Sequence, residues 1–318
     1  MRTQTASRSK TNPKDHVKKI LVIGSVAFDL IFSVSDDFRK SIPLENGEIS
    51  NFNASYLANE KKEFPGGTAG NIAFWLGQEE SPATVFSAWG KDFALKGYRE
   101  RLEKSGTKFR GHEGDYTATA YMISDPLHQQ LIIWQANAYA KNDDLNLVDH
   151  INSDELADFD YAIFSAGTPA SITKHIQEFR QANPDAIVIF DPGQISQFFT
   201  KEDFQTCCKH ANILIGNDTE FKYFQGYGIP TDTAQDKQLI QIETLGADGV
   251  LLREENNEEQ IKTNPVENPV ETTGAGDAFR AGLIASLAKG QDLKTACLRG
   301  AELGAKVVTL ESGQEAAP

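Results

Sequence analysis

The stretch that decides the fold is Glu271-Thr272-Thr273-Gly274-Ala275-Gly276-Asp277-Ala278-Phe279. Small residues let a backbone approach a ligand closely, and the free amides at a helix start hold an anion. The apolar pattern that follows predicts a helix over 274–289. A carboxylate beside an anion site repels phosphate unless it takes up a proton or faces a metal ion. The stretch therefore predicts phosphoryl transfer, with a cradle at 274–276 and Asp277 as the general base. The alternative is an ordinary helix start with an acidic first turn.

Three further stretches extend this pattern: Gly66-Gly67-Thr68-Ala69-Gly70-Asn71, Asn217-Asp218-Thr219-Glu220 and Thr244-Leu245-Gly246-Ala247-Asp248-Gly249. With the first stretch they resemble, in the same order, the signatures of the PfkB family, the ribokinase and adenosine kinase group of small-molecule kinases. The resemblance covers residues 18 to 312. It implies an ATP-dependent kinase with a ribokinase-like fold. Runs such as Phe190-Asp191-Pro192-Gly193-Gln194 are most similar to bacterial and archaeal adenosine or nucleoside kinases.

Composition narrows the class of protein. The chain has 318 residues, 40% of them hydrophobic, and a net charge of −14. Because no basic block offsets this charge, we expect no binding to nucleic acid or to a membrane surface. The three cysteines form no disulfide framework, which favours a reduced, cytoplasmic setting. Residues 1–16 are polar and basic, so we expect a disordered tail rather than a signal peptide.

Alternating strands and helices predict a three-layer α/β/α domain with a mostly parallel sheet. Short apolar runs indicate its buried strands. The expected strands are 19–24, 83–87, 161–165, 186–190, 212–215 and 239–244, and the expected helices are 67–78, 95–104, 171–181, 201–209, 219–224, 274–289 and 293–310.

Two regions interrupt the alternation. Segments 30–35 and 48–57, and segments 117–124 and 129–134, are strand-like with no helix between them, and a turn at 125–128 favours a hairpin in the second pair. These strands are expected to form a small separate sheet, which by resemblance is a lid over the acceptor substrate that excludes water. The expected division is a lid of 30–61 and 116–135, and a nucleotide-binding domain of 17–29, 62–115 and 136–312.

The phosphate site cannot be a P-loop, because the chain has no Gly-x-x-x-x-Gly-Lys-Ser/Thr. Asn217 and Glu220 follow an apolar strand, and by resemblance Glu220 organises magnesium, often through water, while Asn217 contacts the nucleotide. The alternative is a helix capping box, and both can hold together. The turn residues Thr244, Gly246 and Gly249 are expected by resemblance to line the nucleotide, as is Thr273; the alternative for the turn is a glycine-rich hairpin.

Acceptor recognition is expected from Asp29, which follows the first strand. By resemblance this carboxylate binds two hydroxyls of a sugar, and Asn71 adds a third polar contact. Gly66 and Gly67 would form the hinge of the lid. The alternatives are an ordinary turn for Asp29 and a helix-start turn for the glycines.

Aromatic residues on the lid strands favour a nucleoside over a free sugar, because a ring stacks on a purine. They are Phe28, Phe32, Phe52, Tyr56, Tyr121 and Trp134, with Tyr121 and Trp134 the expected base contacts. The preferred acceptor is adenosine, phosphorylated on its hydroxymethyl group. The rings could instead fill the lid core or a homodimer interface through the lid. The runner-up function is a ribokinase- or fructokinase-like sugar kinase.

Other functions are weaker. A nucleotide or sugar sensor of the same fold has no need of a base at Asp277, and a dinucleotide oxidoreductase is disfavoured because the first strand lacks Gly-x-Gly-x-x-Gly. The chain has Glu271 where the family usually has aspartate, so a monovalent-cation requirement is doubtful. Arg280 is equally compatible with a phosphate contact and with a surface position.

Overall fold

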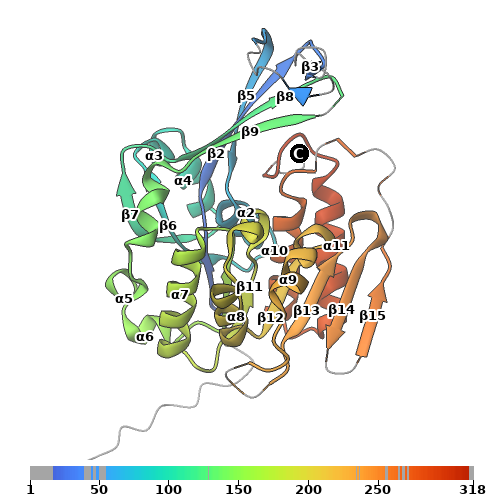
Figure 1. The fold of residues 1–318 in the computed structure, drawn as a ribbon. Helices are drawn as coiled ribbons and strands as arrows, with labels where there is room; N and C mark the ends of the chain where they lie inside the picture. The colour runs from blue at the N-terminus through green and yellow to red at the C-terminus, as the bar shows by residue number, and fades with distance from the viewer. Residues whose placement is uncertain are drawn as a thin grey trace, which may run out of the picture.

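The structure is a computed structural model that describes residues 17–38, 44–45, 48–49, 55–127, 129–233, 235, 237–254, 257–263, 266, 269–270 and 272–314. A large α/β domain carries a smaller sheet that stands above one edge of it (Figure 1). The tail predicted over 1–16 lies outside the described residues, as do Phe52 and Glu271.

The large sheet confirms the predicted, mostly parallel architecture. Its strand order is β15-β14-β13-β12-β11-β10-β1-β6-β7, and every neighbouring pair is parallel except β13 with β14 and β14 with β15. Its central strands are short apolar runs buried on both faces, as helices on both sides of a parallel sheet require. The strands are β1 (Ile20–Ile23), β6 (Ala83–Gly90), β7 (Lys108–Gly114), β10 (Tyr161–Phe164), β11 (Ile187–Phe190), β12 (Ile213–Asn217), β13 (Ile240–Thr244), β14 (Val250–Glu254) and β15 (Asn257–Ile261).

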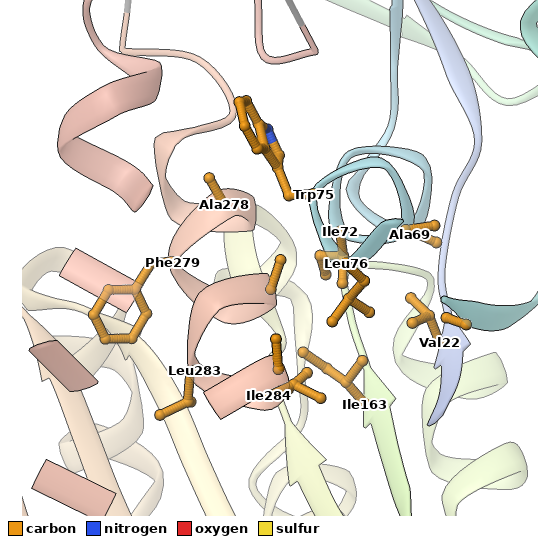
Figure 2. Close-up of a cluster of buried hydrophobic side chains, with 14 of the residues drawn as sticks. Val22, Ala69, Ile72, Trp75, Leu76, Ile163, Ala278, Phe279, Leu283 and Ile284 are labelled. Atoms are coloured by element: carbon orange, nitrogen blue, oxygen red, sulfur yellow. The ribbon is translucent and has the colours of Figure 1, made fainter. Parts of the chain in front are cut away.

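Helices cover both faces of this sheet. Alternate residues of β1 enter two different cores, Val22 with the cluster under α2, α10 and α11, and Ile23 with the cluster under α7 and α8. In Figure 2, Ile72 and Leu76 of α2 and Ile284 of α10 belong to the first cluster with Val22. The long helices are α2 (Thr68–Gln78), α7 (Pro169–Ala182), α8 (Lys201–His210), α9 (Asp218–Tyr227), α10 (Ala275–Ala288) and α11 (Leu293–Val307).

Short elements explain where the predicted boundaries are wrong. The helix predicted over 95–104 begins only at Tyr98, because Gly97, with a left-handed φ of 75°, separates it from a short helix that ends at Leu95. Strands β7 and β15 are not among the predicted strands, since both are polar edge strands without an apolar run. The short elements are α3 (Asp92–Leu95), α4 (Tyr98–Glu103), α5 (Leu147–His150), α6 (Ser153–Leu156), and the 3₁₀ turns η1 (Asn137–Asp143), η2 (Gly193–Phe198) and η3 (Gly246–Asp248).

The small sheet has the order β5-β2-β8-β9, and a two-residue pair, β3 with β4, lies apart from it. The predicted hairpin is confirmed for β8 and β9. The prediction that 48–57 pairs with 30–35 is wrong, because β2 pairs with β5 over 58–66, an edge strand of mostly charged, exposed residues. The strands are β2 (Ala27–Val34), β3 (Leu44–Glu45), β4 (Glu48–Ile49), β5 (Ala58–Gly66), β8 (Ala118–Ser124) and β9 (Gln130–Gln135).

No helix in the described part of the chain is both long and apolar enough for a membrane crossing.

Candidate active site

The start of α10 has the geometry of an anion cradle. Gly274 is the N-cap, with a left-handed φ of 82°, and a Cβ atom there would lie 2.6 Å from the Cα of Gly313. Only glycine therefore fits this position. The N–H groups of Gly276 and Asp277, in the first turn, have no carbonyl partner inside the helix and lie at its positive end, whereas the N–H of Ala275 donates to the carbonyl of Thr272 at 3.2 Å. The predicted cradle thus lies at the N-terminus of a 14-residue helix.

Asp277 lies in this first turn and is partly buried. Its Oδ2 accepts a hydrogen bond of 2.7 Å from Nδ2 of Asn71, in α2. Burial raises the pKa of Asp277 to about 7, although the Asn71 hydrogen bond and the charge of Arg280 act in the opposite direction. A carboxylate that titrates near neutral pH is well suited to act as a general base.

Asp29, on β2, is the second carboxylate of the site. Burial raises its pKa to about 7, and its charge adds to the rise in the pKa of Asp277. A Cβ atom on Gly66 would lie 2.2 Å from Oδ2 of Asp29, so the glycine leaves space for the carboxylate. Gly67 follows with a left-handed φ of 81° at the turn from β5 into α2.

Asn71 is held between two partners. Besides donating to Asp277, it accepts a hydrogen bond of 2.8 Å from Nε2 of Gln314 through its Oδ1. Gln314 is not among the residues that the sequence predicts for the site, because it lies in a short polar segment without a hydrophobic pattern. The structure thus places Asn71 beside Asp277, the predicted general base.

Asn217 and Glu220 form the capping box that the sequence allows. Asn217 Oδ1 accepts from the N–H of Glu220 at 2.8 Å, and Glu220 Oε2 accepts from the N–H of Asn217 at 2.8 Å. Glu220 is only 8% exposed, and burial raises its pKa while the charge of Arg280 lowers it. The cap occupies one Glu220 oxygen.

Arg280 is not a surface residue. It is 6% exposed, and its Nε and Nη2 donate to the two carboxylate oxygens of Asp191 at 2.6 and 2.8 Å. Its Nη1 lies beneath Gly276, where a Cβ atom would be 2.7 Å away. A buried guanidinium therefore supports the floor of the cradle, between Asp277 and Glu220.

A cavity of about 340 Å³ opens beside the cradle, within the size range of small-molecule pockets. Three predicted nucleotide residues, Thr244, Gly246 and Gly249, line it, whereas Thr273 and Asn217 do not. Its remaining walls are largely apolar: Ala247, Val250, Thr263, Val266, Pro269, Thr272, Ala275, Gly276, Phe279, Ala301, Gly304, Ala305 and Val308.

The register of the small sheet places the two predicted aromatic contacts, Tyr121 and Trp134, on opposite faces. Asp29 is paired with Ala120, and Ala120 with Trp134, so Asp29 and Trp134 share one face of the sheet. Tyr121 is on the opposite face, and its hydroxyl donates to Gln135 at 3.0 Å. The expectation that both rings contact one base is therefore wrong. Phe64, paired with Asp29, is on the face of Trp134 and is missing from the sequence prediction because β5 is not recognised as a strand.

Known proteins share the whole of this architecture. A model of the pfkB family of carbohydrate kinases matches residues 17–318. The nucleoside kinase of Methanothermobacter thermautotrophicus is 26% identical, over 94% of this chain and 91% of its own. The nucleoside kinase of Burkholderia thailandensis, solved in complex with inosine, is 27% identical, with a TM-score of 0.78 over 94% of this chain and 93% of its own. The nucleoside kinase of Methanocaldococcus jannaschii, at 24% identity and a TM-score of 0.79 over 93% of each chain, has the same fold. The chain belongs to the pfkB family of carbohydrate kinases.

Proposed function

We propose that this protein is an ATP-dependent nucleoside kinase that phosphorylates the hydroxymethyl group of its acceptor, with adenosine the preferred candidate. The observation that carries the proposal is the proximity of Asp277, at the start of α10, to Asp29 on β2, whose charge raises the pKa of Asp277. The experiment that tests it is a panel of nucleosides and sugars with ATP and magnesium, read as ADP release.

The chemistry follows from the positions of these groups. Asp29 orients the acceptor through the acceptor's diol. Asp277 takes the proton of the hydroxymethyl group as the hydroxyl oxygen attacks the γ-phosphorus of ATP, whose bond to the bridging oxygen breaks so that ADP leaves. The amides of Gly274, Ala275 and Gly276 stabilise the charge that develops on the transferred group, and the buried Arg280 adds a positive charge below them. Gly66 and Gly67 serve as the lid hinge, and closure of the lid excludes water.

The aromatic residues on the face of the small sheet that carries Asp29 support a nucleoside as the acceptor. Phe64 and Trp134 lie on the face of Asp29, on strands to either side of it, and Trp134 is 60% exposed and so available to a ligand. The similar Burkholderia enzyme was solved in complex with inosine, a purine nucleoside. A ribokinase- or fructokinase-like sugar kinase is the alternative, because free sugars present the same hydroxyls to Asp29.

We expect the loss of the Trp134 ring to raise the KM for adenosine about tenfold, because stacking on one base contributes roughly 1–3 kcal/mol. Trp134→Ala should have little effect on the KM for ribose. The matched control is Tyr121→Ala, which removes a ring from the opposite face of the same sheet and should leave both values unchanged. Steady-state kinetics with the two acceptors measure this. An equal loss for adenosine and ribose in the Trp134 variant would make the ring structural.

The nucleotide is expected to bind with its phosphates at the cradle and its base in the adjoining cavity. The Burkholderia enzyme has also been solved in complex with ADP-inosine. Among the described residues no group of three or more His, Cys, Asp or Glu side chains is arranged for a metal. A single carboxylate, that of Glu220, is sufficient for magnesium, because this ion keeps several waters and needs few carboxylates when phosphates are present. Magnesium would neutralise phosphate charge there.

Glu220→Gln is expected to raise the magnesium concentration for half-maximal rate about tenfold. Glutamine keeps the capping box, so the change removes the charge and spares the helix start. The KM for the acceptor should change less than twofold. Asp218→Asn, which removes a neighbouring charge from the same turn, is the control. An unchanged magnesium dependence in Glu220→Gln would leave Glu220 as a cap only.

The lid also supports a homodimer. Strand β9 is an edge strand with large apolar side chains exposed on both faces, among them Ile132 at 39% and Ile133 at 55%. Such an edge is prone to pairing with another chain. We expect light scattering at high micromolar concentration to give twice the monomer mass. Ile133→Lys should yield monomers, whereas Leu298→Lys on α11 should not. A monomeric wild-type protein would contradict the dimer.

A further inference from the structure

Gln314 is the last residue that the structure describes, and it lies beside Asn71 of α2. This residue is fully buried. Two contacts anchor its backbone: Trp75 Nε1 donates to the carbonyl of Gly313 at 2.7 Å, and Arg101 donates to the carbonyl of Gln314 itself. The side-chain amide is thereby fixed in the interior, where its Nε2 donates to protein groups and its Oε1 has no hydrogen-bond partner among the described residues.

These hydrogen bonds form a chain in which the donors run outward from Gln314, to Tyr98 and Gly66 on one side and to Asn71 and Asp277 on the other. The carbonyl of Gly66 can only accept, so the hydroxyl of Tyr98 donates to it, at 2.9 Å. The Tyr98 oxygen then accepts from Nε2 of Gln314. The second hydrogen of this Nε2 goes to Oδ1 of Asn71, at 2.8 Å. Asn71 is therefore left with Nδ2 toward Asp277, which accepts at 2.7 Å.

We infer that Gln314 is a positioning residue for the general base. By donating to Oδ1 of Asn71, it fixes which end of the Asn71 amide faces Asp277. The inference rests on the proposed function, in which Asp277 removes the proton of the acceptor hydroxyl.

The consequence is chemical, because the two ends of an asparagine amide have opposite effects on a carboxyl group. A donor facing Asp277 stabilises the ionised form that can accept a proton, whereas an acceptor facing it stabilises the protonated form that cannot. Among the described residues, the Gln314 donor is the contact that sets which way the Asn71 amide is turned. Burial raises the pKa of Tyr98, so its hydroxyl keeps the proton that sets the direction.

The chain also joins the base to the lid. Its first acceptor, Gly66, is the last residue of strand β5. Tyr98 fills the space beside α2, since a Cβ atom on Gly70 would lie 2.0 Å from the Tyr98 hydroxyl oxygen. The position of a lid strand is thus linked, through Tyr98 and Gln314, to the orientation of Asn71.

The charged groups around Asp277 are not altered by a substitution of Gln314. They are Arg280 on α10, Asp191 after β11 and Asp29 on β2, of which Arg280 favours the ionised base and the two aspartates oppose it. A shift in the titration of Asp277 on replacing Gln314 therefore reports the hydrogen-bond chain and not a change in nearby charge.

The test compares Gln314→Met, which keeps the length of the side chain and removes its donor, with the wild-type protein. The carboxyl groups of aspartate are labelled with ¹³C, the Asp277 signal is assigned by its loss in Asp277→Asn, and its pKa is measured by NMR titration. We expect a rise of about one pH unit in Gln314→Met. The acid limb of kcat/KM should move to higher pH by the same amount, with little change in the acceptor KM.

Two further variants complete the experiment. Tyr98→Phe releases the Gln314 amide from its other partner and should shift the Asp277 pKa in the same direction, so it serves if Gln314→Met does not fold. Gln205→Met removes another amide that donates to backbone carbonyls, between α8 and the end of α9, and should leave the pKa unchanged. An unshifted Asp277 pKa in the folded variants overturns the inference. Failure of the proposed function shows separately, as a wild-type protein that phosphorylates no nucleoside.

Discussion

Asp277→Asn is expected to lower kcat by about 10²- to 10⁴-fold, the usual contribution of a general base. Asparagine keeps the size of the side chain and the start of α10, but it cannot take the proton of the acceptor. Binding of ATP should be nearly intact, because the amides of the cradle are unchanged. Steady-state rates of ADP release and nucleotide titrations measure the two effects separately.

The pH dependence of kcat/KM provides a second test of Asp277 as the base. Because burial raises the pKa of Asp277 to about 7, the base is protonated and inactive below that pH. We therefore expect kcat/KM to fall as the pH drops through about 7, and the residual activity of Asp277→Asn to lack this limb. The control is Asp203→Asn, which removes a carboxylate from the first turn of α8 and should keep both the rate and the profile. Near wild-type turnover in Asp277→Asn would remove this residue from the role of base.

Asp29→Ala is expected to lower kcat/KM by at least about 10²-fold for every acceptor, nucleoside or sugar. The carboxylate is proposed to accept two hydrogen bonds from a diol, and hydrogen bonds to a charged group contribute about 1.5–3 kcal/mol each. Because all these acceptors share the hydroxyls, the loss should not discriminate between adenosine and ribose. This uniform loss of kcat/KM distinguishes Asp29 from Trp134, because the ring of Trp134 stacks only on acceptors that carry a base.

The control for Asp29 is Glu60→Ala, which removes an exposed carboxylate from the far part of lid strand β5. Its kinetics should match those of the wild type. A loss confined to one acceptor class in Asp29→Ala would show that the carboxylate reads something other than the shared hydroxyls.

The sequence predicts best those elements whose buried faces impose a pattern. Four-residue apolar runs become β1, β10 and β11, because both faces of a parallel sheet are covered. The stretch at 274–279 becomes the start of α10, since glycine in a left-handed conformation and small neighbours are a local requirement of the cradle. Backbone chemistry and burial are thus readable from a few adjacent residues.

Features set by contacts between distant segments are not readable in this way. Strand β5 consists mostly of charged, exposed residues, so its sequence has no apolar pattern that predicts a strand. The register of β5 against β2 places Phe64 beside Asp29. The opposite orientations of Tyr121 and Trp134 depend on the pairing of β8 with β9. Gln314 reaches Asn71 across 243 positions of sequence, through a polar segment without periodicity.

The most direct test of the central proposal is the acceptor panel: adenosine, inosine, other nucleosides, ribose and fructose, each with ATP and magnesium, with ADP release as the readout. We expect ADP release with purine nucleosides. The kcat/KM for adenosine should be at least about tenfold above that for ribose, because the base stacks on Trp134 and Phe64. Asp277→Asn should release ADP only at its residual rate. Phosphorylation of ribose or fructose but of no nucleoside would contradict the nucleoside assignment, and the absence of ADP release with every acceptor would contradict the kinase itself.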